Sequence, residues 1–148
     1  MKQPFVWKPF AVIAFAFLFL VPAPPAQDTA EEKLAIARSL HEQMSLCIQK
    51  GDYPKLEEGF RKLIGLRLQG RYEKAVVDEV QILSEQLVRR GALDVAMSLV
   101  DSALAALREK ESQSRLLKEK GLLYKQQGKT DKAMEMFEAA RKIETAAP

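Results

Sequence analysis

The sequence predicts an all-α protein, an α-solenoid of about three helix–turn–helix repeats that follows an N-terminal hydrophobic segment. Three observations support this prediction. No stretch after residue 27 alternates apolar and polar residues with the β-branched enrichment that is typical of a strand. Six amphipathic segments with helical spacing fill this region, and glycines or short polar breaks separate them. One order of small and apolar residues after a turn glycine recurs three times.

We expect six helices, near residues 31–50, 54–69, 71–90, 93–109, 112–127 and 131–144. Gly51 ends the first, because glycine adopts the left-handed conformation of a helix C-terminus without a steric cost. Pro54 suits the first turn of the second helix, where its missing N–H would have no helical partner. Gly91 and Gly128 end the third and fifth helices in the same way. Thr130 is the expected N-cap of the sixth.

The internal repeat appears when each turn glycine is taken as the origin. In each unit, small or apolar residues follow the glycine at positions +5, +9 and +12. The three sets are Gly51, Leu56, Phe60, Leu63; Gly91, Ala96, Val100, Ala103; and Gly128, Ala133, Phe137, Ala140. One hairpin cannot bury its apolar stripe alone, so such units stack, and about three are needed for stability.

The last unit carries a resemblance to a known family. The residues that match in type and spacing are Gly121, Tyr124, Ala133, Phe137 and Ala140. They resemble the tetratricopeptide repeat consensus, although Leu117 and Lys120 stand where that consensus has tryptophan and leucine. The resemblance implies repeat units near residues 37–70, 77–110 and 114–147. It also implies that the glycine and alanines are small because paired helices approach closely there, while the aromatic residues fill the gaps between helices.

The N-terminus predicts export. A short basic lead precedes the apolar run Phe10–Val21, and a small-residue stretch follows it. A helix of 12 residues rises about 18 Å, well short of the roughly 30 Å hydrocarbon core of a bilayer. This length favours a signal peptide, formed by residues 1–26, and argues against a full membrane span. Prolines near the expected cleavage site leave an uncleaved membrane anchor as the alternative. Residues 27–33 are the expected linker and residues 34–147 the repeat domain, located in the periplasm or another extracytoplasmic space.

Charge and residue types exclude several function classes. Lys2 and Lys8 supply two of the three net positive charges, so the remainder is nearly neutral and gives no reason to expect nucleic acid. Gly128-Lys129-Thr130 match the last three residues of a phosphate-binding loop. The glycine that such a loop has five residues before Gly128 is absent, however, and no predicted strand precedes this segment. His41 is the only histidine, which excludes a histidine-rich metal site. Cys47 is the only cysteine, and we expect it to be a buried apolar residue.

The resemblance implies where a partner would bind, because the first helices of such repeats line a concave groove. The groove positions carried over are Arg38, His41, Gln81, Glu85, Arg89, Arg115, Lys118, Leu122 and Lys125. Three of the last four are basic and share one helical face. We therefore expect an acidic peptide or a carboxylate terminus as the partner.

The function expected from the sequence is that of a non-enzymatic interaction scaffold or adaptor of the cell envelope. We expect a protein or peptide partner, no nucleic acid, no cofactor, no metal and a monomeric array. The alternative is an accessory subunit of an envelope enzyme or assembly complex, tethered to the membrane through residues 5–26.

Overall fold

The computed structural model describes residues 29–146, which form six α-helices and one short 3₁₀ helix. In chain order the elements are α1 (Ala30–Lys50), α2 (Tyr53–Gly65), η1 (Gly70–Tyr72), α3 (Glu73–Arg89), α4 (Leu93–Ala106), α5 (Lys110–Gln126) and α6 (Thr130–Thr145). Residues 29–146 contain no strand, so the prediction of an all-α protein is confirmed for them. The expected signal or anchor segment, residues 1–26, lies outside the described residues.

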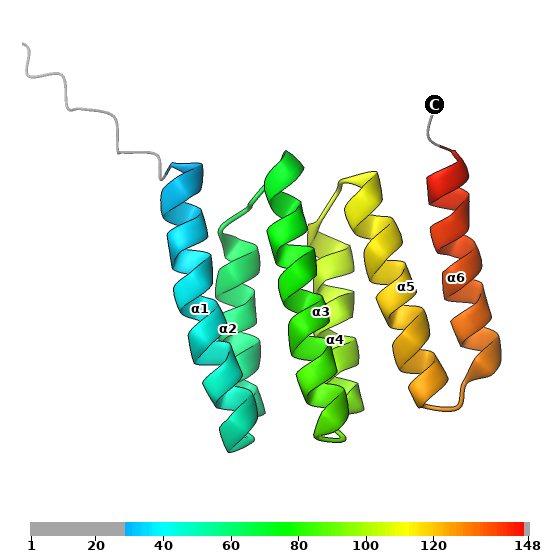
Figure 1. Cartoon of the computed structure of the whole chain (residues 1–148), viewed down its shortest axis with the longest axis horizontal. Helices are drawn as coiled ribbons and strands as arrows, with labels where there is room; N and C mark the ends of the chain where they lie inside the picture. Colours follow the sequence, from blue (N-terminus) through cyan, green and yellow to red (C-terminus); the bar gives the residue numbers. More distant parts are fainter. Residues whose placement is uncertain (1–28, 147–148) are drawn as a thin grey trace, which may run out of the picture.

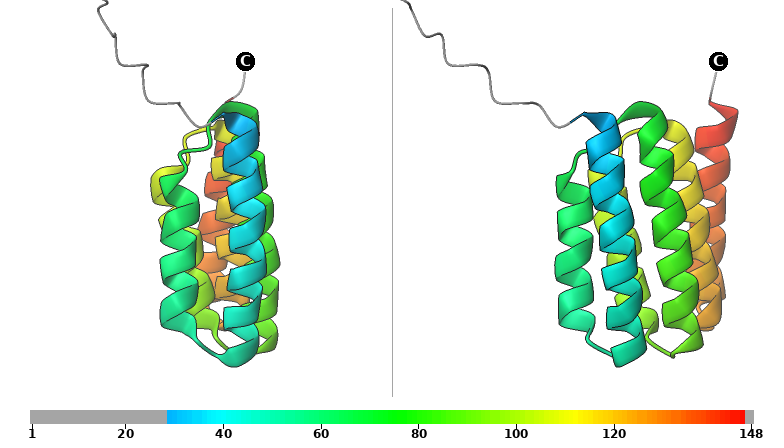
Figure 2. Two further views of the ribbon diagram at one scale, coloured as in Figure 1. Left: turned by 90° about the vertical axis from the view of Figure 1, so that its left-hand side faces the viewer. Right: turned by 60° about the vertical axis from the view of Figure 1, so that its left-hand side comes forward.

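The six helices pair in chain order as three antiparallel hairpins that stand side by side (Figure 1). α1, α3 and α5 contact one another in succession, and α2 and α4 contact each other in a second row behind them. The turns within the hairpins lie at one end of the array (Figure 1), and the connections between hairpins lie at the other, as further views also show (Figure 2). α6 reaches the rest of the array through extensive contact with α5.

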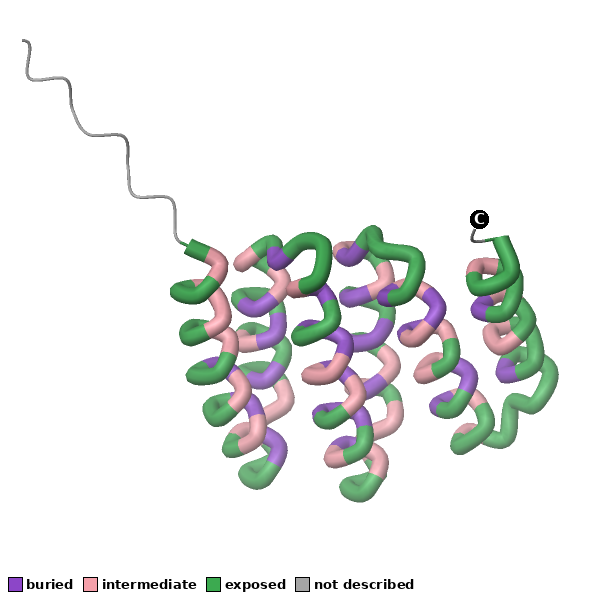
Figure 3. Tube along the Cα trace, turned by 45° about the horizontal axis from the view of Figure 1, so that its top comes forward, coloured by how far each residue is buried: buried purple, intermediate pink, exposed green. Residues whose placement is uncertain are grey.

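The hydrophobic core lies between the two rows of helices. Buried residues gather on the sides of the helices that face their neighbours (Figure 3). One continuous cluster runs from Leu40 in α1 to Leu123 in α5, and Phe60 is the largest of its fully buried side chains. Complete burial of a side chain of this kind contributes roughly 1.5–3 kcal/mol. Cys47 is half-buried and packs against this cluster.

α1 begins within one residue of the expected start, at a capping box that lies inside the expected linker of residues 27–33. The Thr29 hydroxyl accepts the Glu32 N–H at 3.2 Å, and the Glu32 carboxylate accepts the Thr29 N–H at 2.8 Å. This reciprocal capping box satisfies two backbone donors at the helix start. Residues 30–33 are consequently the first turn of α1, although the sequence analysis placed them in a linker. The Thr-x-x-Glu spacing was the signal for this start.

The three turn glycines have the expected role. Gly51, Gly91 and Gly128 have φ values of 73°, 73° and 72°, the left-handed region that side chains with a Cβ rarely adopt. Gln127, Gly128 and Lys129 form the turn between α5 and α6, and Thr130 follows as the first residue of α6. The expectation that Thr130 is the N-cap is wrong, because Lys129 occupies that position and Thr130 is already helical.

Two helices end earlier than the sequence predicts. α2 ends at Gly65 instead of residue 69, and α4 ends at Ala106 instead of residue 109. In both connections a leucine leaves the helix and enters the core, with Leu68 5% and Leu107 4% exposed. Burial of these side chains therefore overrides the helical propensity of the residues around them.

A buried carboxylate ties the second hairpin to the third. Glu73, at the start of α3, is only 4% exposed. Its oxygens accept the backbone N–H of Arg108 at 3.0 and 3.2 Å and that of Glu109 at 3.0 Å. Since buried backbone donors need partners, this side chain stabilises the connection between α4 and α5.

Candidate functional site: the α1/α3/α5 face

The outward side of α1, α3 and α5 forms one continuous surface, which we call the α1/α3/α5 face. Its members are Arg38, His41, Glu42, Asp78, Glu79, Gln81, Ile82, Glu85, Arg89, Arg115, Lys118, Glu119, Leu122 and Lys125. The face includes every groove position expected from the sequence. His41, Gln81 and Arg115 are half-buried, and the other expected groove residues are exposed.

A cleft of about 450 Å³ separates α1 from α3. Leu34 and Ala37 of α1 and Ile82 of α3 supply apolar walls, and Leu63 and Leu68 lie behind them. Arg38, His41, Glu42 and Glu79 add charged and polar groups to the same cleft. A cleft of this size accommodates one or two large side chains of a partner.

His41 and Glu79 join α1 to α3 across this cleft. The His41 Nδ1 atom lies 2.7 Å from Oε2 and 2.9 Å from Oε1 of Glu79. Burial raises the pKa of the Glu79 carboxyl, and the neighbouring His41 opposes that rise. The sequence pattern indicated His41 as a groove residue but did not indicate Glu79 as its partner. The available signal was a carboxylate directly beside the apolar stripe of Val76, Val77 and Val80.

Arg115 joins α5 to α3. Its Nη2 donates to Oδ1 of Asp78 at 2.6 Å and to Oε1 of Gln81 at 2.5 Å. The guanidinium is therefore held by two acceptors of the neighbouring hairpin, and the side chain is only 27% exposed. A guanidinium held in this way contributes to the packing of α5 against α3, and a partner would have to compete with Asp78 and Gln81 for it.

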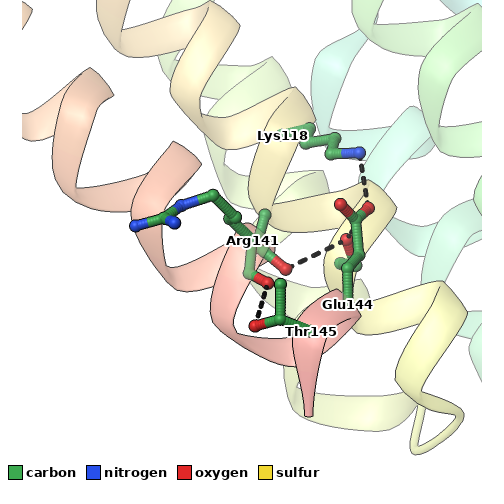
Figure 4. Close-up of polar contacts among 6 residues, drawn as sticks. Lys118, Arg141, Glu144 and Thr145 are labelled. Atoms are coloured by element: carbon green, nitrogen blue, oxygen red, sulfur yellow. Dashed lines mark hydrogen bonds and ion pairs between the residues drawn. The ribbon is translucent and has the colours of Figure 1, made fainter. Parts of the chain in front are cut away.

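Lys118 joins α5 to α6. Its ammonium group pairs with the Glu144 carboxylate (Figure 4). The same carboxylate accepts a hydrogen bond from the Ser114 hydroxyl at 2.6 Å. Figure 4 also shows the Thr145 hydroxyl donating to the Arg141 carbonyl, at 3.0 Å, one turn along α6. The hydrogen bonds from Lys118 and then Ser114 lower the pKa of Glu144.

Other groups of the face lack such partners. The ion pairs formed within residues 29–146 leave Glu42 and Glu119 without a cation. Burial raises the pKa of Glu119, and the negative charge of Glu85 raises it further. Ile82 and Leu122 are exposed by 45% and 50%. The middle of the face thus combines exposed apolar side chains with carboxylates.

The residues expected to pack the last repeat lie between α5 and α6. Gly121 is buried against the Phe137 ring, and Ala133 and Ala140 are 3% and 0% exposed. Tyr124 is half-buried, with the ammonium groups of Lys120 and Lys132 5.9 and 5.6 Å from its ring centre. Small residues allow these two helices to approach closely.

Two comparisons with known sequences were made for this chain, and neither found a match. A scan against models of protein families found no match for this chain. A search of curated proteins found no significantly similar sequence. Among residues 29–146, no group of three or more His, Cys, Asp or Glu side chains has a geometry suited to a metal ion. None of the helices in this part of the chain has the length and hydropathy needed to cross a bilayer.

Proposed function

We propose that the three hairpins are a short α-solenoid of tetratricopeptide-like repeats that binds a segment of a partner protein on the α1/α3/α5 face. The repeat interpretation is supported by the left-handed glycine after α1, α3 and α5. It is also supported by the small residues at which α5 and α6 meet. The protein acts without catalysis, as a scaffold or adaptor.

The observation that carries this proposal is the open cleft between α1 and α3. It has apolar walls, polar groups at defined positions and the exposed Ile82 at its side. An apolar pocket with a few polar groups is typical of a surface that orients a bound side chain. Residues on a rigid helical scaffold also lose little entropy when a partner binds, which favours affinity.

The location proposed for this function is the cell envelope. The proposal depends on the apolar run Phe10–Val21 and its basic lead. Cleavage would release a soluble adaptor, whereas retention of residues 1–26 would give a membrane-tethered accessory subunit. The intact mass of the chain isolated from its native cells distinguishes these two forms, because only the second contains the N-terminal residues.

Photo-crosslinking tests the interaction itself. A photoreactive phenylalanine analogue replaces Ile82 or Leu122 on the α1/α3/α5 face, and Glu57 of α2 or Ser102 of α4 as exposed controls on the other row. We expect one discrete adduct in the native cells from the first two positions and none from the controls. Adducts from the control positions alone would reject this face as the binding surface.

A further inference from the structure

The charge of the face gives the chemistry of its partner, provided that the proposed binding function is correct. From the sequence alone we expect an acidic partner, because Arg115, Lys118 and Lys125 share one side of α5. The structure supplies Arg115 with Asp78, and Lys118 with Glu144. Lys125 alone in this group has no acidic partner within the described residues, so two of the three expected cations are already engaged in ion pairs.

The unpaired charges lie in different parts of the face. Two cations of the α1/α3/α5 face have no acidic partner within residues 29–146: Arg38, in the first half of α1, and Lys125, near the end of α5. α1 and α5 are the outer helices of this row, with α3 between them (Figure 1), so these two cations belong to opposite edges of the face. The carboxylates of Glu79, Glu85 and Glu119 lie between them.

Burial raises the pKa of two central carboxylates, and of these two only Glu79 has a partner, the imidazole of His41. Burial raises the pKa of Glu79. His41 lowers this pKa, and the negative charge of the neighbouring Glu42 raises it. Burial likewise raises the pKa of Glu119, with Glu85 adding to it. Arg89 pairs with Glu85, but no cation within residues 29–146 pairs with Glu119. A half-buried carboxylate beside a second carboxylate is stabilised by a cation that a partner brings.

We propose that the α1/α3/α5 face binds a peptide segment that carries an apolar side chain close in sequence to a lysine or arginine. The apolar side chain enters the cleft between α1 and α3, against Leu34, Ala37 and Ile82. The cation of the segment lies beside Glu119, on the side of α5 that faces Glu85. An acidic segment would instead place its carboxylate against the carboxylates of this region, which is unfavourable.

A display selection tests this partner chemistry. A library of random 12-residue peptides is selected on the full chain held in detergent micelles, and each recovered peptide is tested against Ile82→Asp. We expect recovered peptides to contain lysine or arginine within four positions of a large apolar residue. We also expect their binding to be lost in the Ile82→Asp variant, whose helical content is checked by circular dichroism.

The position of the cation is tested with one recovered basic peptide. Glu119→Lys should weaken its binding by about tenfold or more, since a favourable charge pair becomes a repulsive one. The matched control is Glu135→Lys, an equal charge change at an exposed position of α6, which should leave the dissociation constant within about twofold. Unchanged binding to Glu119→Lys would overturn the proposed cation site.

The outcomes separate this inference from the function on which it rests. Recovery of acidic peptides whose binding depends on Ile82 would overturn the inference and leave the proposed function intact. Peptides whose binding is indifferent to Ile82→Asp would overturn both, as would the recovery of no peptide above the micelle blank.

Discussion

Gly121 of α5 lies so close to Phe137 of α6 that no side chain fits between them. A Cβ atom added to Gly121 would lie 2.7 Å from Cε1 of the Phe137 ring. The first hairpin has the opposite arrangement, because a Cβ atom added to Gly59 of α2 would lie 2.9 Å from Cγ of Met44 of α1. In both hairpins a large side chain on one helix lies against a glycine on the other, which allows the helices to approach closely.

Gly121→Ala should lower the free energy of unfolding by about 1–3 kcal/mol, because the methyl group forces the Phe137 ring out of its position. The steric cost should exceed the stabilisation of about 1 kcal/mol that alanine provides over glycine inside a helix. Urea denaturation measures the difference.

Two further variants control this experiment. Gly65→Ala, in α2, adds a methyl group where no atom lies within 4 Å and should not destabilise the protein. The double variant Gly121→Ala/Phe137→Leu should regain part of the loss, because leucine leaves room for the methyl group. A Gly121→Ala protein that is more stable than the parent would contradict the close packing of α5 and α6.

Glu73→Ala should lower the free energy of unfolding by roughly 1–3 kcal/mol, because it leaves the partly buried N–H groups of Arg108 and Glu109 without their acceptor. Glu73→Gln keeps one carbonyl oxygen and should fall between the parent and Glu73→Ala. Thermal and urea unfolding of the parent and both variants measure this order of stabilities. Equal stability of the parent and Glu73→Ala would show that this carboxylate does not stabilise the connection.

Glu119→Gln should be more stable than the parent near pH 7. The pKa of Glu119 is raised in the folded protein, so its stabilising contribution is complete below its unfolded pKa and is lost as the pH rises through the folded pKa. Glutamine does not ionise and avoids that loss. The advantage of the variant should therefore grow as urea unfolding is repeated from pH 4 to pH 7.

Glu144→Gln provides a comparison of opposite sign. The pKa of Glu144 is lowered by Lys118 and Ser114, so its contribution is present above the unfolded pKa and is lost as the pH falls through the folded pKa. This variant should be less stable than the parent at pH 7, and the difference should shrink toward acid pH. The same trend in both variants would contradict the assigned environments.

Local signals were sufficient to predict the helices and their turns. Gly51, Gly91 and Gly128 were identifiable because a left-handed helix end favours glycine whatever surrounds it. The early ends of α2 and α4 were not identifiable, because they depend on the burial of Leu68 and Leu107 against distant residues. These leucines differ in no local property from leucines that continue a helix.

Helical spacing groups residues of one helix, but it does not reveal which of their charges are paired. Helical spacing placed Arg115, Lys118 and Lys125 together, as the sequence analysis expected. Their partners Asp78 and Glu144 come from other helices, 37 and 26 residues away in sequence. Spacing within one helix does not reveal such pairs, and the available charge of a surface depends on them.

The most direct test of the account is an NMR titration with isoleucine methyl groups labelled. The described residues contain Ile36, Ile48, Ile64, Ile82 and Ile143, of which Ile82 alone belongs to the α1/α3/α5 face. With the tightest peptide from the display selection, we predict the largest shift at Ile82 and little change at Ile64 of α2 and Ile143 of α6. A large shift at Ile64 or Ile143 with Ile82 unmoved would contradict the assignment of the binding surface.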